Sequence, residues 1–236
     1  MKQSQYYYLL RRGLFRSISS AVREGLVMFN KFTTAGISHP AQGSAEFDGS
    51  SDYIQLNEPF SYTNHTIAAW VYVNDDATDK YVLSAQDGGS DGIGLFLRSN
   101  EQVRYRLVDS SLTSTNTYSS EWIFVTATYD GTTQKLYIDG SQDQSATVTK
   151  TVSNTTDARI GSRSYSLADY FNGNLANVAI WNRALSSDEI NSVMWKSYDG
   201  LTASETSGLQ AWYSLDDISG SSVPDSSGNG NNGTAY

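Results

Sequence analysis

Between Glu121 and Gly140, large side chains occupy both the odd and the even positions of two predicted strands. On the first strand, near 121–129, alternation places four residues on one face: Ile123, Val125, Ala127 and Tyr129. The other face carries Trp122 and Phe124. A turn at Asp130-Gly131 leads to a second strand near 133–139, and Asp139-Gly140 predicts another turn. Because this hairpin is apolar on both faces, we expect it in the middle of a layered β structure.

Alternating segments predict further strands from Ala45 onward. We expect them near 45–48, 52–56, 66–73, 80–85, 92–98, 102–108, 158–161 and 174–181. Turn-forming clusters at 48–52, 74–79 and 87–92 separate them at short spacing. This spacing is typical of an all-β sandwich or jelly roll.

One helix is predicted, from Ser186 to Ser197. Ser186 and Glu189 have the spacing of a capping box, and Leu185 with Ile190 has that of a hydrophobic staple. We expect this short helix to pack on the sandwich as a structural cap.

The formal net charge of −9 divides unevenly along the chain. Residues 1–43 carry six basic side chains and one acidic side chain, whereas the remainder carries 10 basic and 24 acidic ones. We therefore expect the basic arm to meet a different partner from the one that the acidic body faces. The acidic body would repel phosphates, so no nucleic-acid partner is expected. No apolar run approaches the roughly 20 residues of a membrane span, and the absence of cysteine excludes disulfides.

The basic arm, residues 1–43, permits two interpretations. One is a loosely ordered terminal tail. The other is an anchor that orders against another subunit, with tyrosine and leucine supplying contact area and arginine supplying charge pairs. The anchor residues would be Tyr6, Tyr7, Tyr8, Leu9, Arg11, Arg12 and Arg16. Residues 25–32 could alternatively supply a strand to the body. The N-terminus lacks an uninterrupted apolar stretch, so we expect no signal peptide.

Four stretches in order resemble the laminin-G-like domains of the concanavalin A-like lectin and glucanase superfamily, in its bacterial and viral branch. They are AEFDGSSDYIQL at 45–56, TIAAWVYV at 66–73, VTATYDG with LYIDG within 125–140, and FNGNLANVAIWNRALSSDEINSVM at 171–194. The resemblance implies an all-β, two-sheet antiparallel jelly-roll sandwich with one short capping helix, here with an N-terminal extension. It says less about activity, because this fold hosts lectins, hydrolases and structural modules.

The C-terminal segment, residues 208–236, departs from the family order. In the resembled family such a segment stands before the FDG strand, whereas here it ends the chain. We expect a circular permutation in which 209–215 pairs beside the strands around Phe47, so that 44–236 forms one sandwich. The alternative is the start of a second, shortened repeat, which would leave Trp212 and Tyr213 without a core.

Two loops rich in Asp, Asn and Gly resemble loops of the family and predict a structural Ca²⁺ site. Carboxylate and amide oxygens are ligands that Ca²⁺ prefers. The candidate ligands are Asp48, Asp52, Asp225 and Asn229. The alternative is that these side chains only form Asx turns.

Catalysis has little support in the sequence. The Glu-x-Asp-x-x-Glu arrangement of the glucanase relatives, whose paired carboxylates cleave glycosidic bonds, is absent. His39 and His65 lie in separate turn regions without a Ser or Cys nucleophile motif, and we expect both at the surface. The chain is therefore predicted not to be an enzyme.

A glycan site is the other binding hypothesis. Sugar sites combine aromatic faces with hydrogen-bonding groups, and two regions offer both. The candidate residues are Arg98, Arg104, Tyr105 and Arg106 on adjacent predicted strands, with Tyr165 and Tyr170 in a long loop. Such a face is also common on an ordinary solvated surface.

Our leading functional expectation is a non-catalytic, surface-displayed module of a larger assembly. Virion decoration or attachment proteins of this fold are the model, with the arm contacting protein subunits and the sandwich facing outward. We expect its location to be a virion surface or the extracellular space. The alternative is a stand-alone carbohydrate-binding module, in which the arm is incidental.

Overall fold

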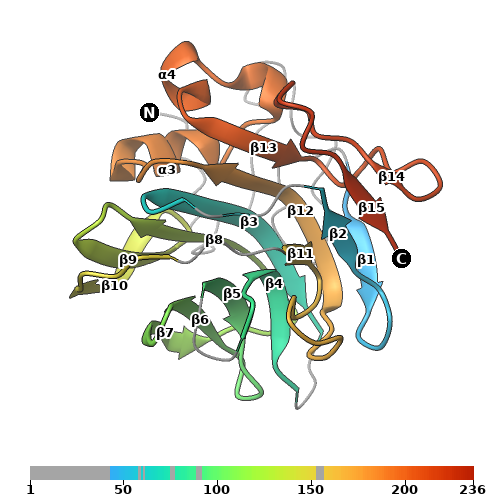
Figure 1. The fold of residues 1–236 in the computed structure, drawn as a ribbon, viewed down its shortest axis with the longest axis horizontal. Coiled ribbons are helices and arrows are strands. Elements are labelled where there is room, and N and C mark those ends of the chain that lie inside the picture. The colour runs from blue at the N-terminus through green and yellow to red at the C-terminus, as the bar shows by residue number, and fades with distance from the viewer. Residues whose placement is uncertain (1–42, 58–59, 61, 75–77, 89–91, 153–156) are drawn as a thin grey trace, which may run out of the picture. The chain divides into compact units, whose positions relative to one another are not determined.

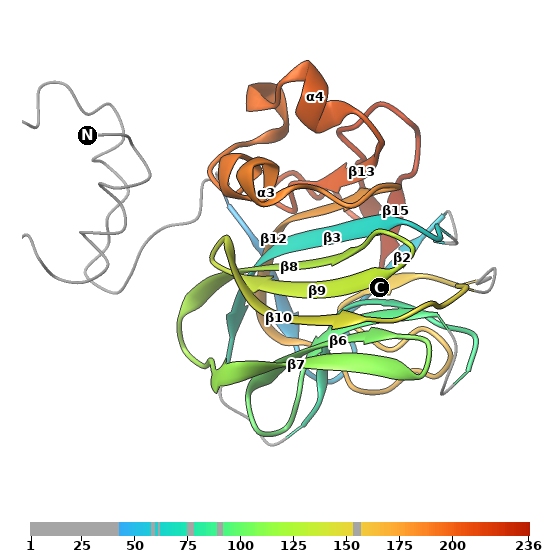
Figure 2. The same cartoon turned by 90° about the vertical axis from the view of Figure 1, so that its left-hand side faces the viewer.

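Two antiparallel sheets, A and B, form the body of the protein in the computed structural model (Figures 1 and 2). The structure describes residues 43–57, 60, 62–74, 78–88, 92–152 and 157–236. Within these residues, sheet A has the order β1-β12-β3-β8-β9-β10, with β13 also paired to β12, and sheet B has the order β14-β15-β2-β11-β4-β5-β6-β7. The predicted all-β, two-sheet sandwich is confirmed.

The strands of sheet A are β1 (Ala45–Asp48), β3 (His65–Val73), β8 (Trp122–Tyr129), β9 (Thr133–Ile138), β10 (Ser141–Thr147), β12 (Asn172–Trp181) and β13 (Leu209–Tyr213). Those of sheet B are β2 (Ile54–Leu56), β4 (Lys80–Ala85), β5 (Ile93–Leu97), β6 (Gln102–Leu107), β7 (Ser110–Thr117), β11 (Arg159–Ile160), β14 (Ser222–Val223) and β15 (Gly233–Ala235). The helical elements of the described residues are α3 (Ser187–Val193), η2 (Tyr198–Gly200) and α4 (Ala203–Thr206).

The central hairpin is β8–β9, and it lies inside sheet A between β3 and β10. Its first turn is closed by Asp130, whose Oδ1 accepts hydrogen bonds from the amides of Thr132 (2.9 Å) and Thr133 (2.7 Å). The second turn, Asp139-Gly140, has positive φ at both residues (49° and 76°), as a type I′ hairpin requires.

The hairpin is buried on both faces because sheet A separates two apolar cores. The main core lies between the sheets and includes Val125, Ala127 and Tyr129 of β8 with the inward residues of β4, β5 and β6. The second core lies on the outer face of sheet A. Its largest members are Trp70, Phe124, Tyr137, Trp181 and Trp212, packed against Ile190, Val193 and Met194 at α3.

The helix at 187–193 begins with the predicted capping box. The Ser186 side chain accepts from the Glu189 amide, and the Glu189 carboxylate accepts from the Ser186 amide. The helix is shorter than the predicted span, ending at Val193. A second capping box, Thr202 with Glu205, begins α4. This helix was not predicted, although the T-x-x-E spacing is a local signal for it.

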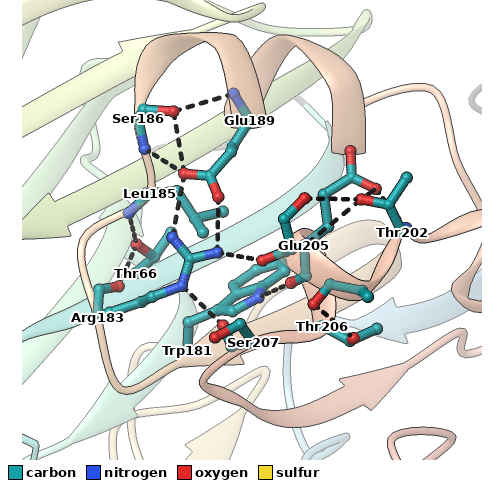
Figure 3. A network of polar contacts seen from close by, with 12 residues as sticks. Thr66, Trp181, Arg183, Leu185, Ser186, Glu189, Thr202, Glu205, Thr206 and Ser207 are labelled. Atoms are coloured by element: carbon teal, nitrogen blue, oxygen red, sulfur yellow. Dashed lines mark hydrogen bonds and ion pairs between the residues drawn. The ribbon is translucent and has the colours of Figure 1, made fainter.

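Arg183 ties both helical segments to the end of β12 (Figure 3). Its guanidinium makes two hydrogen bonds to the Glu189 carboxylate, at 3.0 and 2.7 Å, and donates to the carbonyl oxygens of Ser204 and Ser207, both at 2.7 Å. The Trp181 indole donates to the Glu205 carbonyl oxygen at 2.7 Å. These bonds hold the helical segments over the outer face of sheet A.

The C-terminal segment adds strands to both sheets. β13 pairs with the second half of β12, whose first half pairs with β1, so β1 and β13 follow one another along the same side of β12 (Figure 1). β15 pairs with β2 in sheet B. Trp212 and Tyr213 are both buried, as a segment that completes the cores would be.

His65 is buried, contrary to the expected surface position. Its Nδ1 is 3.2 Å from the Tyr62 carbonyl oxygen, which can only accept, so Nδ1 carries the proton and Nε2 accepts from the Tyr105 hydroxyl at 2.6 Å. The rings of Tyr105 and Tyr129 surround it. Burial lowers the pKa of His65 from 6.5 to about 4, against hydrogen bonds to Tyr62 and Thr63 that raise it. His39 lies outside the described residues, as do all the anchor residues of the arm.

We predict an acid-sensitive fold from this histidine. The unfolded chain binds the His65 proton more tightly than the folded chain does. The contribution of neutral His65 to the free energy of unfolding is therefore fully present above pH 6.5 and is lost as the pH falls toward 4. The loss amounts to about 3 kcal/mol. Urea unfolding at several pH values should show a steeper decline for the native chain than for His65→Gln, which cannot titrate. Equal slopes would contradict the prediction.

Candidate functional site

The outer face of sheet B is the sheet face that no helix of the described residues covers. Strand register aligns one row of side chains across it: Gln55, Arg159, Ser84, Gly94, Arg106 and Ser111. These positions alternate with Ile54, Ile160, Ile93, Leu95, Tyr105 and Leu107 of the main core, so they face away from it. A polar row on the uncovered sheet is the first feature of the candidate site.

A pocket of about 500 Å³ opens beside this row, where the loop after β11 passes the end of β4. Gln86 and Ser164 are buried in its lining. The Ser164 hydroxyl accepts a hydrogen bond from the backbone N–H of Gln86 and donates one to the backbone carbonyl oxygen of Gln86, both at 2.8 Å. The Gln86 Nε2 is buried and has no hydrogen-bond partner. The pocket therefore has a rigid backbone framework and one unused donor among its lining residues.

One wall of the pocket is a charged network. The Arg159 guanidinium donates to Asp157 (2.8 Å) and to the Gln55 Oε1 (3.0 Å), and the Gln55 Nε2 donates to the other Asp157 oxygen at 2.6 Å. Each group in this network orients the next, so the polar groups beside the pocket are held in fixed positions.

The other wall is apolar and solvent-facing. Tyr165 is 37% exposed and Leu167 56% exposed, which makes them two of the three exposed large hydrophobic side chains in the described residues. Arg163 lies over the Tyr165 ring, 5.2 Å from its centroid, donates to its hydroxyl at 3.2 Å, and forms an ion pair with Asp169. The loop thus presents an aromatic ring that is supported from within the protein.

A second row lies beside the first on the same face. Tyr81 stacks on Phe96, with ring centroids 4.5 Å apart, and Phe96 is directly opposite Arg104 in the register. Burial is the main cause that raises the pKa of Tyr81, against the nearby charge of Arg163, so this phenol stays neutral.

The structure separates the residues predicted to bind glycan. Arg104 and Arg106 project from the outer face, Arg98 follows the end of β5, Tyr165 lines the pocket, and Tyr170 is half-buried just before β12. Tyr105 must be removed from the set: it is fully buried in the main core, because on a strand the residue between two outward arginines points inward.

The remaining pocket residues were not predicted: Gln86, Asp87, Asp157, Arg159, Ser164, Ser166 and Leu167. The alternation of side chains along a single strand does not reveal these residues, because it does not say which strands are neighbours. Arg159, for example, lies beside Ser84 only because β11 pairs with β4. A local hint was the Asp157-x-Arg159 spacing, which places both side chains on one side of a strand.

The two loops predicted to share a calcium ion do not come together. Asp48 ends β1 opposite Asn172, whereas Asp225 bonds the amide of Trp212, which pairs with Ala179 on the same strand β12. Seven residues of extended strand separate these positions by about 20 Å. Among the described residues, no group of three or more His, Cys, Asp or Glu side chains is placed to hold a metal ion.

Each loop instead uses its carboxylate to close its own turn. Asp48 Oδ1 accepts from the amides of Ser50, Ser51 and Asp52, and its Oδ2 accepts from the Ser50 hydroxyl. The bond from the Ser50 hydroxyl is the largest cause that lowers the pKa of Asp48, and the backbone amides lower it further. Asp225 accepts from the amides of Trp212, Ser227 and Asn231. The side chains of Asp52 and Asn229 are likewise hydrogen-bonded to backbone groups. These residues therefore do not fit one calcium site shared by the two loops.

We expect neither excess Ca²⁺ nor a chelator to change the melting temperature, because these carboxylate oxygens already accept hydrogen bonds from the protein. Asp225→Ala should lower the free energy of unfolding by about 2 kcal/mol in both solutions, since it leaves buried amides unpaired. Calorimetry of both chains in both solutions measures this. A Ca²⁺-dependent rise in the melting temperature that Asp225→Ala abolishes would show that the loop binds the ion.

Comparison with known proteins supports the fold independently of this geometry. The laminin G family model described as the concanavalin A-like lectin/glucanases superfamily matches residues 48–191. No curated protein sequence is significantly similar. None of the described helices is long and apolar enough to cross a membrane.

Three solved structures illustrate the similarity. A candidate carbohydrate-binding protein from Bacteroides ovatus has a TM-score of 0.68 at 17% identity, covering 82% of this chain and 57% of its own, so the chain spans little more than half of that protein. An SAP-like heptameric pentraxin from Limulus polyphemus has a TM-score of 0.52 at 14% identity, covering 63% and 80%. The CBM40 of a Ruminococcus gnavus sialidase, bound to α2,3-sialyllactose, has a TM-score of 0.50 at 15% identity, covering 65% and 99%.

At these identities the structures are evidence for the fold alone, whereas the family model covers more than half of the chain. Together with the two-sheet architecture, this match shows that the chain belongs to the laminin G family of the concanavalin A-like lectin/glucanase superfamily.

Proposed function

We propose that this protein is a non-catalytic carbohydrate-binding module whose ligand lies in the pocket on the outer face of sheet B. The observation that carries the proposal is the exposed Tyr165 ring beside the ordered Asp157–Arg159–Gln55 network. An aromatic face matches the apolar face of a sugar ring, and fixed carboxylate, guanidinium and amide groups match its hydroxyls. The Gln86 Nε2, which has no partner, is a further donor among the lining residues.

The relatives favour this function over the assembly role that we expected from the sequence. The Bacteroides ovatus protein and the CBM40 are both described as carbohydrate-binding. None of the three relatives described above is a virion protein. The anchor role depends on Tyr6, Tyr7, Tyr8, Leu9, Arg11, Arg12 and Arg16, which lie outside the described residues, so it stays a prediction.

The absence of catalysis in this proposal has electrostatic support. A glycosidase needs a carboxylic acid whose pKa is raised so that it can donate a proton. Where the pKa of a carboxyl clearly departs from its ordinary value in the described residues, it is lowered. Hydrogen bonds from Arg183 are the largest cause for Glu189, whose pKa falls to about 2.

Replacing Tyr165 with alanine should weaken glycan binding about tenfold or more, because the aromatic anchor of the pocket is lost. The melting temperature should change little, since the ring is exposed. A glycan array identifies the ligand, and titration calorimetry measures the affinity. Tyr72→Ala, which removes a ring from the other sheet, is the matched control and should bind normally. If the native chain binds no glycan, or if both variants bind as the native chain does, the proposed function is wrong.

A further inference from the structure

The arginines of the body are concentrated on one sheet. Residues 44–236 contain six of them. Arg183 belongs to the helical cover of sheet A, whereas the other five lie on sheet B or in the loops that adjoin it: Arg98, Arg104, Arg106, Arg159 and Arg163. The body carries 24 acidic and only 10 basic side chains, so this face concentrates positive charge on an otherwise acidic domain.

These arginines differ in what compensates their charge. Arg159 is paired with Asp157, and Arg163 with Asp169. Arg104 donates only to the Ser111 hydroxyl at 2.7 Å, and Arg106 donates to the Val108 carbonyl oxygen at 3.2 Å. Neither has a carboxylate partner among the described residues. Two half-buried guanidinium groups on this face therefore keep an uncompensated positive charge.

The surroundings of Arg104 hold it in place. Its Nε is buried without a hydrogen-bond partner, and its neighbour across the strands is Phe96, which stacks on Tyr81. A guanidinium that is partly removed from water interacts more strongly with an anion than a fully solvated one does. Its planar fork also matches a carboxylate or sulfate with two parallel hydrogen bonds.

Arg106 lies in line with the pocket, and Arg104 lies in the second row, two residues away on the same strand. Arg106 shares a row with Arg159, and three strand-to-strand steps separate them: β11 to β4, β4 to β5 and β5 to β6. This corresponds to about 14 Å. Ser84 and Gly94, the residues between them, are buried: the Ser84 hydroxyl is 3.0 Å from the Ser164 hydroxyl, and a Cβ at Gly94 would lie 3.1 Å from the Tyr81 ring. A ligand that joins the pocket to Arg106 would therefore pass above these side chains and not along the sheet itself.

From this arrangement we propose that the natural ligand is an anionic glycan, bearing carboxylate or sulfate groups, that extends from the Tyr165 pocket across sheet B to Arg106 and Arg104. The proposal rests on the carbohydrate-binding function proposed above and adds the class of ligand. A sugar unit occupies the pocket, and an acidic group further along the chain pairs with the uncompensated guanidinium groups.

The test measures binding of the full chain to two matched pairs of polymers by titration calorimetry. Polygalacturonate is compared with its carboxyl-reduced form, and dextran sulfate with dextran. We expect the acidic member of one pair to bind and its neutral counterpart to bind at least tenfold more weakly. The pair that shows the difference tells whether carboxylate or sulfate is the preferred group.

Charge-matched variants locate the contact. Arg106→Gln and Arg104→Gln should each weaken binding of the acidic polymer about tenfold. Arg106→Lys should recover part of the loss, because it restores charge without the planar fork. Lys135→Gln removes one positive charge from β9 of sheet A and should leave the affinity unchanged. Thermal unfolding of each variant checks that the fold is intact.

The outcomes separate the two proposals. If neutral and acidic glycans bind equally, or if Tyr165→Ala abolishes binding while both arginine variants bind normally, the anionic-ligand proposal is overturned and the carbohydrate-binding function stands. If Lys135→Gln weakens binding as much as Arg106→Gln does, the attraction is a general charge effect and the proposal fails. If no glycan of either class binds, both proposals fail.

Discussion

Sheet A is apolar on both faces, and the rest of the structure depends on covering it twice. One face forms the main core with sheet B, in which Val125 and Tyr129 are fully buried. The other face carries Trp70, Trp181 and Trp212, which would expose a large apolar surface to water without the helical segments above them. Arg183 secures this cover by joining β12 to Glu189 and to the backbone of the α4 segment (Figure 3).

This requirement determines which surface is free to bind a ligand. Because the helical segments occupy the outer face of sheet A, the outer face of sheet B is the one that no helix of the described residues covers, and its polar row and arginines lie there. The β11–β4 pairing then brings the loop that carries Tyr165 beside Gln86. The position of the candidate site therefore follows from the packing of the opposite sheet as much as from its own residues.

The C-terminal segment contributes strands to both sheets and side chains to both cores. β13 extends sheet A and brings Trp212 into the second core, while β15 extends sheet B beside β2. Tyr213 and Leu215 enter the main core from the same segment. Burial in the two cores explains the apolar side chains within residues 209–215.

The sequence by itself determined the elements whose signals are local. The two-faced hairpin at 121–140, most strands and the Ser186 capping box were predictable because alternation and capping depend on neighbouring residues. Strands β7 and β10 were missed because they are polar edge strands, whose side chains contribute little to a core. Only the tertiary structure decided that His65 is buried against Tyr105 and that Asp48 and Asp225 lie apart, beside different parts of β12. It also decided that Arg159 stands opposite Ser84, since pairing between distant strands has no local signature in the chain.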